Sequence, residues 1–263
     1  MIKVLGIPYD ANSSYLRGPA LAPPRIRLMD TEGSANSFSE DGTEIIAGKI
    51  YDDLGDILFE NEDPAKAFTS IRKNITTQLA GNNKILCFGG DHSVSYPIID
   101  AFADKYENLN ILHLDAHADL YDNFDDNRYS HASPFARIME KGNVKSLTQV
   151  GIRTLTKHQK EQAAKFGVSM VETRDFNFDF IQKLASPLYI SLDIDVLDPA
   201  FAPGVSHHEP GGLSTRQLLN IIQSISVNIV GADIVEYNPV RDINNMTAMV
   251  VYKMFKELLA KMI

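Results

Sequence analysis

Residues 188–195 read Leu-Tyr-Ile-Ser-Leu-Asp-Ile-Asp, a short apolar run that passes into two carboxylates. Such a run, rich in aliphatic and aromatic side chains, is typical of a strand that is buried on both faces of a parallel sheet. The sequence predicts this strand at 188–194. Similar runs predict further strands along the whole chain, at residues 2–7, 84–88, 110–114, 147–152 and 228–235.

Segments with the spacing of amphipathic helices alternate with these runs. They span residues 64–79, 93–105, 133–141, 157–166, 215–225 and 247–263. Alternating strands and helices indicate an α/β fold, in which helices cover both faces of a mainly parallel sheet. No repeat or linker rich in Pro, Gly and Ser divides the 263 residues, so we expect a single domain over residues 1–263.

The composition excludes several classes of partner. Lys and Arg number 25 against 34 Asp and Glu, a net charge of −9, which argues against binding to nucleic acid or to an anionic membrane. The single cysteine, Cys87, allows no internal disulfide and no cysteine-based zinc site. No signal peptide or membrane-spanning run is recognisable. These features predict a cytoplasmic protein.

Acidic and histidine side chains gather where four of the predicted strands end. Gly-Gly-Asp-His-Ser follows residues 85–88, Asp-Ala-His-Ala-Asp follows 111–114, Asp-Ile-Asp follows 188–192 and Glu236 follows 230–235. In open parallel sheets, ligands bind outside the carboxyl ends of the strands. We therefore expect the functional site at this edge of the sheet.

The residue types at this edge favour a metal site. Side chains two residues apart on an extended chain point to one face, and adjacent carboxylates repel each other unless a cation lies between them. The candidate ligands are His92, Asp115, His117, Asp119, Asp193 and Asp195. Four carboxylates and two imidazoles without sulfur suit Mn²⁺ better than structural zinc, with Fe²⁺, Co²⁺ or Ni²⁺ as alternatives. So many ligands favour two ions that share carboxylates, and the resulting negative centre favours a cationic substrate.

Three sequence blocks carry a resemblance to a known family. Gly-Gly-Asp-His-Ser at 89–93, Asp-Ala-His-Ala-Asp at 115–119 and the stretch 191–199 resemble the ureohydrolases, which include arginases and agmatinases. The resemblance covers nearly the whole chain. Further stretches look most like plant-type arginases, at 12–19, 22–27, 129–133, 203–207 and 209–214. The resemblance implies a three-layer sandwich with about eight strands in its central sheet, and assembly into homotrimers or homohexamers, to which the last helix is expected to contribute.

The same resemblance implies a mechanism. Two Mn²⁺ ions per subunit are held by the six candidate ligands, with one imidazole for each ion and with Asp115 and Asp193 bridging them. A hydroxide attacks a guanidinium carbon, and urea and an amine are released. Asp119 positions the hydroxide and takes up its proton, His131 acts as the proton shuttle, and Glu236 pairs with the substrate guanidinium.

The identity of the substrate depends on the rim of the pocket. Arginine carries an ammonium and a carboxylate at the end where agmatine has neither. The expected rim is residues 120–130, in which Asn127, Arg128 or Ser130 is a candidate to hold the carboxylate. The overall similarity favours L-arginine. The alternatives are agmatine and a non-catalytic relative that binds a guanidino ligand, while the ligand count disfavours a zinc deacetylase of related fold.

Four other residues and one segment receive weaker expectations. Asp91 is expected to orient a ligand imidazole and His113 to be a hydrogen-bonded core histidine. His207 and His208 either line the pocket or lie in a solvated loop. The segment from Asp30 to Ile45 is either an active-site flap or a mobile loop.

Overall fold

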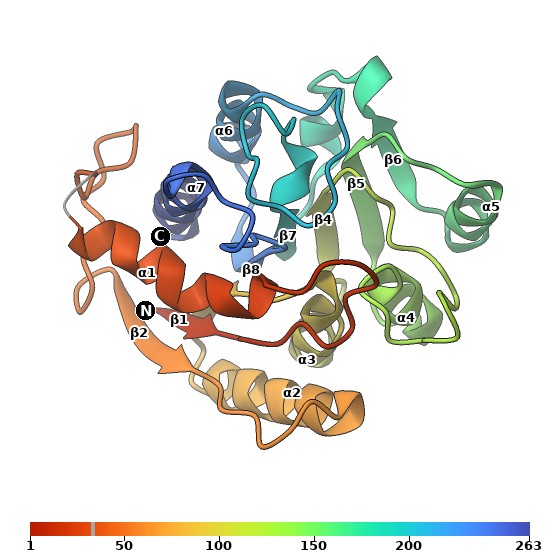
Figure 1. Ribbon diagram of the computed structural model, residues 1–263, viewed down its shortest axis with the longest axis horizontal. Coiled ribbons are helices and arrows are strands. Elements are labelled where there is room, and N and C mark those ends of the chain that lie inside the picture. The colour runs from red at the N-terminus through yellow and green to blue at the C-terminus, as the bar shows by residue number, and fades with distance from the viewer. Residues whose placement is uncertain (33–34) are drawn as a thin grey trace.

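The structure, a computed structural model, describes residues 1–32 and 35–263. Eight strands form one sheet in the order β2-β1-β3-β8-β7-β4-β5-β6, and all neighbouring pairs are parallel (Figure 1). They are β1 (Ile2–Gly6), β2 (Tyr51–Asp56), β3 (Lys84–Phe88), β4 (Asn110–Leu114), β5 (Ser146–Ile152), β6 (Ser169–Glu172), β7 (Leu188–Asp193) and β8 (Ile229–Val235). Every strand that the sequence predicts is present within one residue at each end.

Helices cover both faces of this sheet, which confirms the predicted three-layer α/β sandwich (Figure 1). One face packs against α1 (Ala22–Thr31), α6 (Thr215–Ser224) and α7 (Met246–Met262). The other packs against α2 (Pro64–Ala80), α3 (Ser95–Lys105), α4 (Pro134–Lys141) and α5 (Lys157–Phe166). Among the described residues, no helix has the length and apolar character needed to cross a bilayer.

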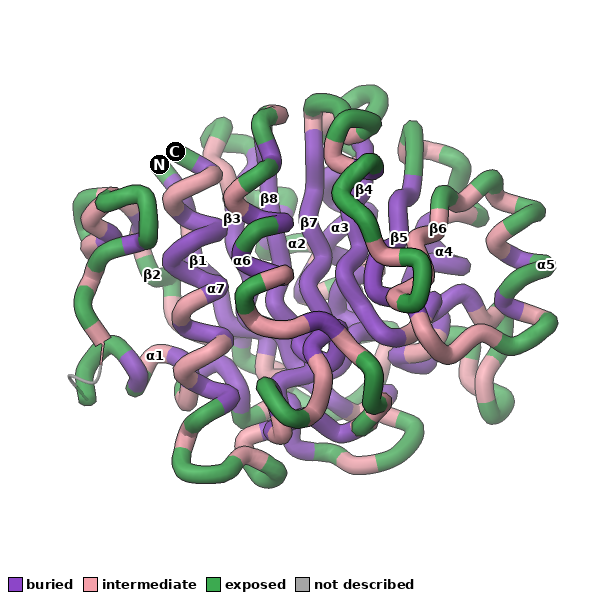
Figure 2. Tube along the Cα trace, turned by 90° about the horizontal axis from the view of Figure 1, so that it is seen from above, coloured by how far each residue is buried: buried purple, intermediate pink, exposed green. Residues whose placement is uncertain are grey.

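The central strands are buried along almost their whole length. Every residue of β4, β7 and β8 is buried, and in Figure 2 the buried trace concentrates in these strands. The edge strands β2 and β6 are partly exposed and carry polar residues. A search for continuous apolar runs therefore finds the centre of the sheet and misses both edges.

The sequence prediction also missed α1, which begins with Ala-Pro-Pro. Proline is tolerated in the first turn of a helix because the amides there have no intrahelical partner. Ile26 and Met29 are buried from this helix. The helix α7 lies between α1 and α6, and eleven of its 17 residues are buried, so much of this helix belongs to the core.

The segment from Asp30 to Ile45 contacts α6 and α7. Glu40 pairs with Arg216 at 2.7 Å, and the amino group of Lys256 donates to the Asn36 carbonyl at 2.5 Å. Two residues of the expected flap, Gly33 and Ser34, lie outside the described residues. None of the described residues from 35 to 45 lines the cavity at the carboxyl edge of the sheet.

Candidate active site

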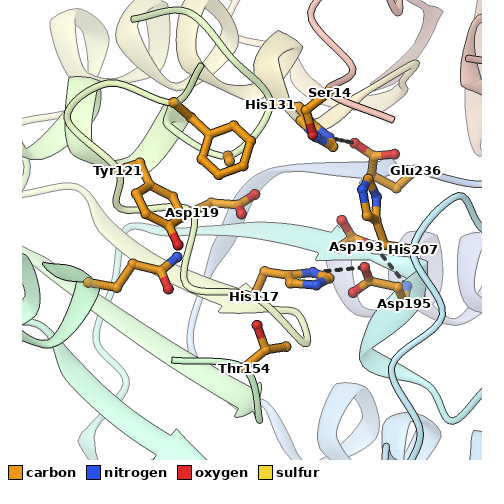
Figure 3. A pocket seen from close by; sticks show the side chains of 13 residues that line it. Ser14, His117, Asp119, Tyr121, His131, Thr154, Asp193, Asp195, His207 and Glu236 are labelled. Carbon is orange, nitrogen blue, oxygen red and sulfur yellow. Dashed lines mark hydrogen bonds and ion pairs between the residues drawn. The ribbon is translucent and has the colours of Figure 1, made fainter. Parts of the chain in front are cut away.

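Four neighbouring strands bring the predicted site residues together. The strands β3, β8, β7 and β4 are adjacent in the sheet, so their carboxyl ends meet. A cavity of about 180 Å³ opens there (Figure 3). Of the predicted site residues, those that line it are His117, Asp119, His131, Asp193, Asp195 and Glu236. His92 and Asp115 are fully buried beside them.

The backbone around the cavity adopts unusual conformations. Asp119 and Glu236 have φ angles of 48° and 63°, in the left-handed region that non-glycine residues seldom adopt. A Cβ atom at Gly90 would lie 1.7 Å from the carbonyl oxygen of Tyr9, so only glycine fits where the chain after β1 crosses the end of β3. Strain of this kind gathers at functional sites, where the surrounding structure holds it in place.

Nδ1 of His92 faces three carboxylates. It lies 3.1 Å from an oxygen of Asp115, 3.0 Å from one of Asp119 and 3.2 Å from one of Asp193. The ring is buried, and Nδ1 makes no hydrogen bond of good geometry with any described residue. A buried nitrogen lone pair that points into a ring of carboxylate oxygens suits a cation, so this observation fits the metal site predicted from the sequence.

A second group forms around His117. Nδ1 of His117 lies 3.0 Å from Oδ2 of Asp195 and 3.4 Å from Oδ1 of Asp115, and these atoms lie close enough to share one ion (Figure 3). The other oxygen of Asp115 faces His92. Asp115 therefore presents one oxygen to each imidazole, which is the arrangement that a carboxylate bridging two ions requires.

Without a cation, the negative charges of the carboxylates at this site repel one another. Burial raises the pKa of Asp193 well above its usual range, and the charges of Asp195 and Asp115 raise it further. Burial also raises the pKa of Asp195, to about 6, although the nearby His117 opposes this. A dication between them would favour the ionised forms, because it supplies the opposite charge that the buried carboxylates lack.

A line of buried hydrogen bonds orients His92 from behind. Its Nε2 lies 3.0 Å from the hydroxyl of Ser191, which donates to Asp233 at 2.7 Å. Asp233 also accepts a bond from the hydroxyl of Tyr189 at 2.8 Å. If Nε2 carries the hydrogen, Nδ1 is left free to bind a metal. The sequence analysis missed Asp233, although a lone carboxylate within the apolar run of β8 is a signal that could have found it.

His113 and Asp91 have different roles from each other. His113 is a buried, hydrogen-bonded core histidine, as expected, with Nε2 2.7 Å from Asp115 and Nδ1 3.0 Å from Gln149. Asp91 does not contact a ligand imidazole. Its oxygens accept bonds from the backbone nitrogen of Asn12 and from the start of the helical turn that follows it, both at 3.0 Å. Asp91 thus ties the chain after β1 to the end of β3.

His131 and Glu236 form a buried pair at the mouth of the site (Figure 3). Nδ1 of His131 donates to Glu236 at 2.7 Å, and Nε2 lies 2.8 Å from the hydroxyl of Ser14. Burial acts to lower the pKa of His131, but the charge of Glu236 outweighs it and raises the pKa to about 9. Burial and the charge of His131 lower the pKa of the neighbouring His207. The shifts of these two neighbours are opposite, and they favour a protonated His131 and a neutral His207 at neutral pH.

The rim differs from the prediction. Tyr121 and Phe124 of the predicted loop line the cavity, but Asn127 and Ser130 are not among the described residues that do so. Their polar atoms are engaged elsewhere, and Nδ2 of Asn127 donates to Oδ1 of Asn12 at 3.2 Å. The side-chain oxygen of Asn127 accepts a backbone bond two residues further on at 2.9 Å, and that of Ser130 accepts one from Ala132 at 3.3 Å. Local turns thus hold both side chains away from the cavity.

Four unexpected residues beyond the predicted loop also line the cavity: Ser14, Ala132, Thr154 and Gln159. Thr154 forms an isolated parallel bridge with His117, and Gln159 lies in the first turn of α5. Of the two loop histidines, His207 lines the cavity, whereas His208 bonds to a backbone carbonyl at 2.8 Å and does not. Thr154 and Gln159 lie far along the chain from the other site residues, so the sequence does not connect them with the site. Only the folded sheet brings the end of β5 beside the end of β4.

Comparisons with known proteins agree with this geometry. Residues 1–260 match the Arginase family. The chain is 46% identical to arginase 1, mitochondrial, of Arabidopsis thaliana, over 98% of this chain and 80% of that one. It is 32% identical to an agmatinase of Bacillus cereus, over 98% of this chain and 90% of the other. The solved structure of the arginase from Medicago truncatula superposes with a TM-score of 0.94 at 42% identity, covering 99% of this chain and 87% of that one.

The predicted cytoplasmic location is wrong in the light of these relatives. Plant arginases at 46% identity are named mitochondrial, or chloroplastic and mitochondrial, which points to an organelle. The prediction relied on the single cysteine, Cys87, which is buried and free. A reduced thiol is compatible with any reducing compartment, so that argument could not distinguish an organelle interior from the cytoplasm.

The family match covers both halves of the chain and all four strand ends that bear the site residues. Two groups of side chains at these strand ends could hold a metal ion, one of His92, His113 and Asp115 and the other of Asp115, His117 and Asp195. Sequence similarity, fold and site geometry thus agree, and the chain belongs to the arginase family of hydrolases.

Proposed function

We propose that the chain hydrolyses a guanidino compound to urea and an amine at a pair of manganese ions, with L-arginine as its substrate. The observation that carries the proposal is the convergence of two imidazoles and four carboxylates at the ends of β3, β4 and β7, where Nδ1 of His92 has no hydrogen-bond partner among the described residues. Identity of 46% to plant arginases supports arginine as the substrate. The proposal includes a single catalytic domain over residues 1–263. It also includes assembly into homotrimers or homohexamers, and light scattering, which measures the mass of the assembly, tests this part.

The residues that would hold the ions are His92, Asp115, His117, Asp119, Asp193 and Asp195. Asp115 and Asp193 would bridge. The chemistry that two such ions supply when bound is acidification of water, which provides a nucleophile near neutral pH. An oxygen-rich donor set with one imidazole for each ion suits Mn²⁺.

The chain's own residues bind the substrate and move its protons. Glu236, ionised and buried, binds the substrate guanidinium through a charge-assisted hydrogen bond. Asp119, which lines the cavity beside His92, accepts the proton of the attacking water at a carboxylate oxygen. His131, whose pKa the paired Glu236 raises, is the general acid that protonates the departing amine nitrogen. Both protons of the water end on the amine, because Asp119 returns the one that it accepted and the second restores the proton that His131 donated. Water and the guanidinium compound thus give urea and a protonated amine.

The test is urea release by the manganese-loaded protein from L-arginine, agmatine and 4-guanidinobutyrate at equal enzyme concentration. We expect the highest kcat/KM with L-arginine. A value more than tenfold higher with agmatine would make the protein an agmatinase instead. Binding of arginine without urea from any of the three compounds would indicate a non-catalytic relative.

Two matched variants separate the catalytic site from the surrounding loops. His131→Ala should lower kcat by about 10²- to 10⁴-fold, the usual contribution of a general acid. His208→Ala removes an imidazole that does not line the cavity and should leave kcat within about twofold. Equal losses in both variants would contradict the role proposed for His131.

A further inference from the structure

One wall of the cavity differs chemically from the rest. The acidic residues that line the cavity, Asp119, Asp193, Asp195 and Glu236, belong to the proposed metal site and its mouth. Another part of the lining, which we call the distal wall, consists of Tyr121, Phe124, Thr154 and Gln159. Figure 3 shows Tyr121 beside Asp119, and Thr154 beside His117, with which it forms a parallel bridge. The distal wall thus contains aromatic, hydroxyl and amide groups, and none of its described lining residues is acidic.

Gln159 has a fixed amide orientation. Its Oε1 accepts hydrogen bonds from the backbone nitrogen of Thr156 at 3.2 Å and from the Thr156 hydroxyl at 3.4 Å. In return, the backbone nitrogen of Gln159 donates to the Thr156 hydroxyl at 3.3 Å. This reciprocal pair is the capping box that begins α5. Flipping the amide would place Nε2 against the backbone N–H of Thr156, donor against donor, so the capping box determines which end of the amide is free.

The free end of the amide is a donor. The Gln159 side chain lines the cavity and the residue is only 3% exposed, yet Nε2 has no hydrogen-bond acceptor among the described residues. Because the capping box engages Oε1, Nε2 is the end of the amide that is free to donate to an acceptor group of a bound ligand. The first turn of α5, with Thr156 as its N-cap, adds the positive end of a helix dipole beside the same wall.

These features favour a carboxylate over an ammonium at the distal end of the substrate. An ammonium needs acceptors or a negative charge. The rim acid Asp122 does not line the cavity and instead lies 3.1 Å from His158, both side chains being about half-exposed. A carboxylate needs donors, which Gln159 and the hydroxyls of Tyr121 and Thr154 supply. Guanidino compounds that end in a carboxylate, such as L-arginine and 4-guanidinobutyrate, match this wall, and agmatine does not.

We propose that Gln159 determines specificity by donating from Nε2 to the carboxylate of an ω-guanidino acid. The proposal rests on the function proposed above and narrows its substrate class. It also replaces Asn127 and Ser130, which local turns hold away from the cavity, as the side chains that recognise the distal end.

Gln159→Glu tests this proposal with little risk to folding. Glutamate retains the oxygen that the capping box needs, and Ser/Thr-x-x-Glu is an ordinary form of that box. The substitution therefore leaves the start of α5 intact but replaces the cavity-facing donor by a negative acceptor. The control is Lys160→Gln, which makes the same change of charge at the next position of the helix, on an exposed side chain that does not line the cavity.

We expect the Gln159→Glu variant to lose about 10- to 100-fold in kcat/KM with L-arginine and 4-guanidinobutyrate, mainly through KM, while agmatine hydrolysis is unchanged or faster. The Lys160→Gln variant should stay within about twofold with all three substrates. Equal changes with acids and agmatine, or no change with the acids, would overturn the role of Gln159. Absence of urea from every substrate with the unsubstituted protein would instead refute the proposed function.

Discussion

Replacing Glu236 by glutamine should remove the proton that His131 holds at neutral pH. Their side chains lie 2.7 Å apart and are buried. Burial acts to lower the pKa of His131, yet the charge and hydrogen bond of Glu236 raise it from 6.5 to about 9. This difference of about 2.5 corresponds to about 3.4 kcal/mol in favour of the charged ring. Because burial remains in the variant while the attraction is lost, we expect the pKa of His131 to fall below 6.5.

The same pair should make stability depend on pH in a defined direction. A histidine whose pKa is raised by folding stabilises the protein fully below its unfolded pKa, near 6.5, and this contribution is lost as the pH rises through about 9. Glu236 stays ionised over this window, because His131 lowers its pKa against the effect of burial. The free energy of unfolding should therefore differ between the two proteins by about 3 kcal/mol near pH 6, and by much less above pH 9.

Carbon-edited NMR titration of the His131 ring, with the metal-free protein, measures the pKa directly. Urea denaturation at several pH values measures the stability difference. Glutamine keeps an oxygen that can accept the bond that the His92 backbone donates to Glu236 at 2.9 Å, so the fold around the site should persist. A pKa of His131 that stays above 8 in the Glu236→Gln variant would refute the reasoning, as would a stability difference that does not change between pH 6 and pH 9.

Three further outcomes are expected. Asp233→Asn should weaken manganese binding by about 10- to 100-fold, because the hydrogen-bonded line that orients His92 loses its terminal charge. Calorimetric titration measures the affinity, and an unchanged affinity would show that this line has no such role. Manganese affinity should decrease as the pH falls below about 6, since protons then compete with the metal for Asp195. An affinity that stays constant from pH 7.5 to pH 5 would contradict the proposed ligand set. Gly90→Ala should destabilise the protein by about 3 kcal/mol or more, because the new methyl group would overlap the Tyr9 carbonyl. A nearly unchanged denaturation midpoint would show that the chain at this point can move to make room.

The sequence predicts the centre of this fold better than its edges. Strands buried on both faces, such as β4 and β7, appear as continuous apolar runs, and their boundaries follow within a residue. The edge strands β2 and β6 have a partly exposed surface and lack such a run. The helix α1 begins with two prolines and buries few large side chains, so periodicity alone does not reveal it.

The sequence likewise predicts one part of the candidate site, the proposed metal ligands, and misses another part, the residues at the rim. The proposed metal ligands follow directly from strand ends, because parallel neighbours bring those ends to one edge. Gln159 could not be predicted, since a glutamine at the third position of a helix is normally only a capping residue. Its second role depends on β5 delivering α5 beside β4, which is a property of strand order. Asn127 failed as a rim residue for the opposite reason, because its side chain closes a local turn.

The strand order also determines when the protein can become active during its synthesis. The two strands at the middle of the sheet, β7 and β8, are translated after the six that flank them. Before β7 and β8 have been made, β4 and β3 each present an unpaired edge, and such edges invite aggregation. Closing them requires pairing between segments far apart in the chain, which is slow compared with local folding. The nascent chain is therefore expected to depend on chaperones at this stage, and to capture its metal only once β7 has inserted, although four of the six proposed ligands are already present.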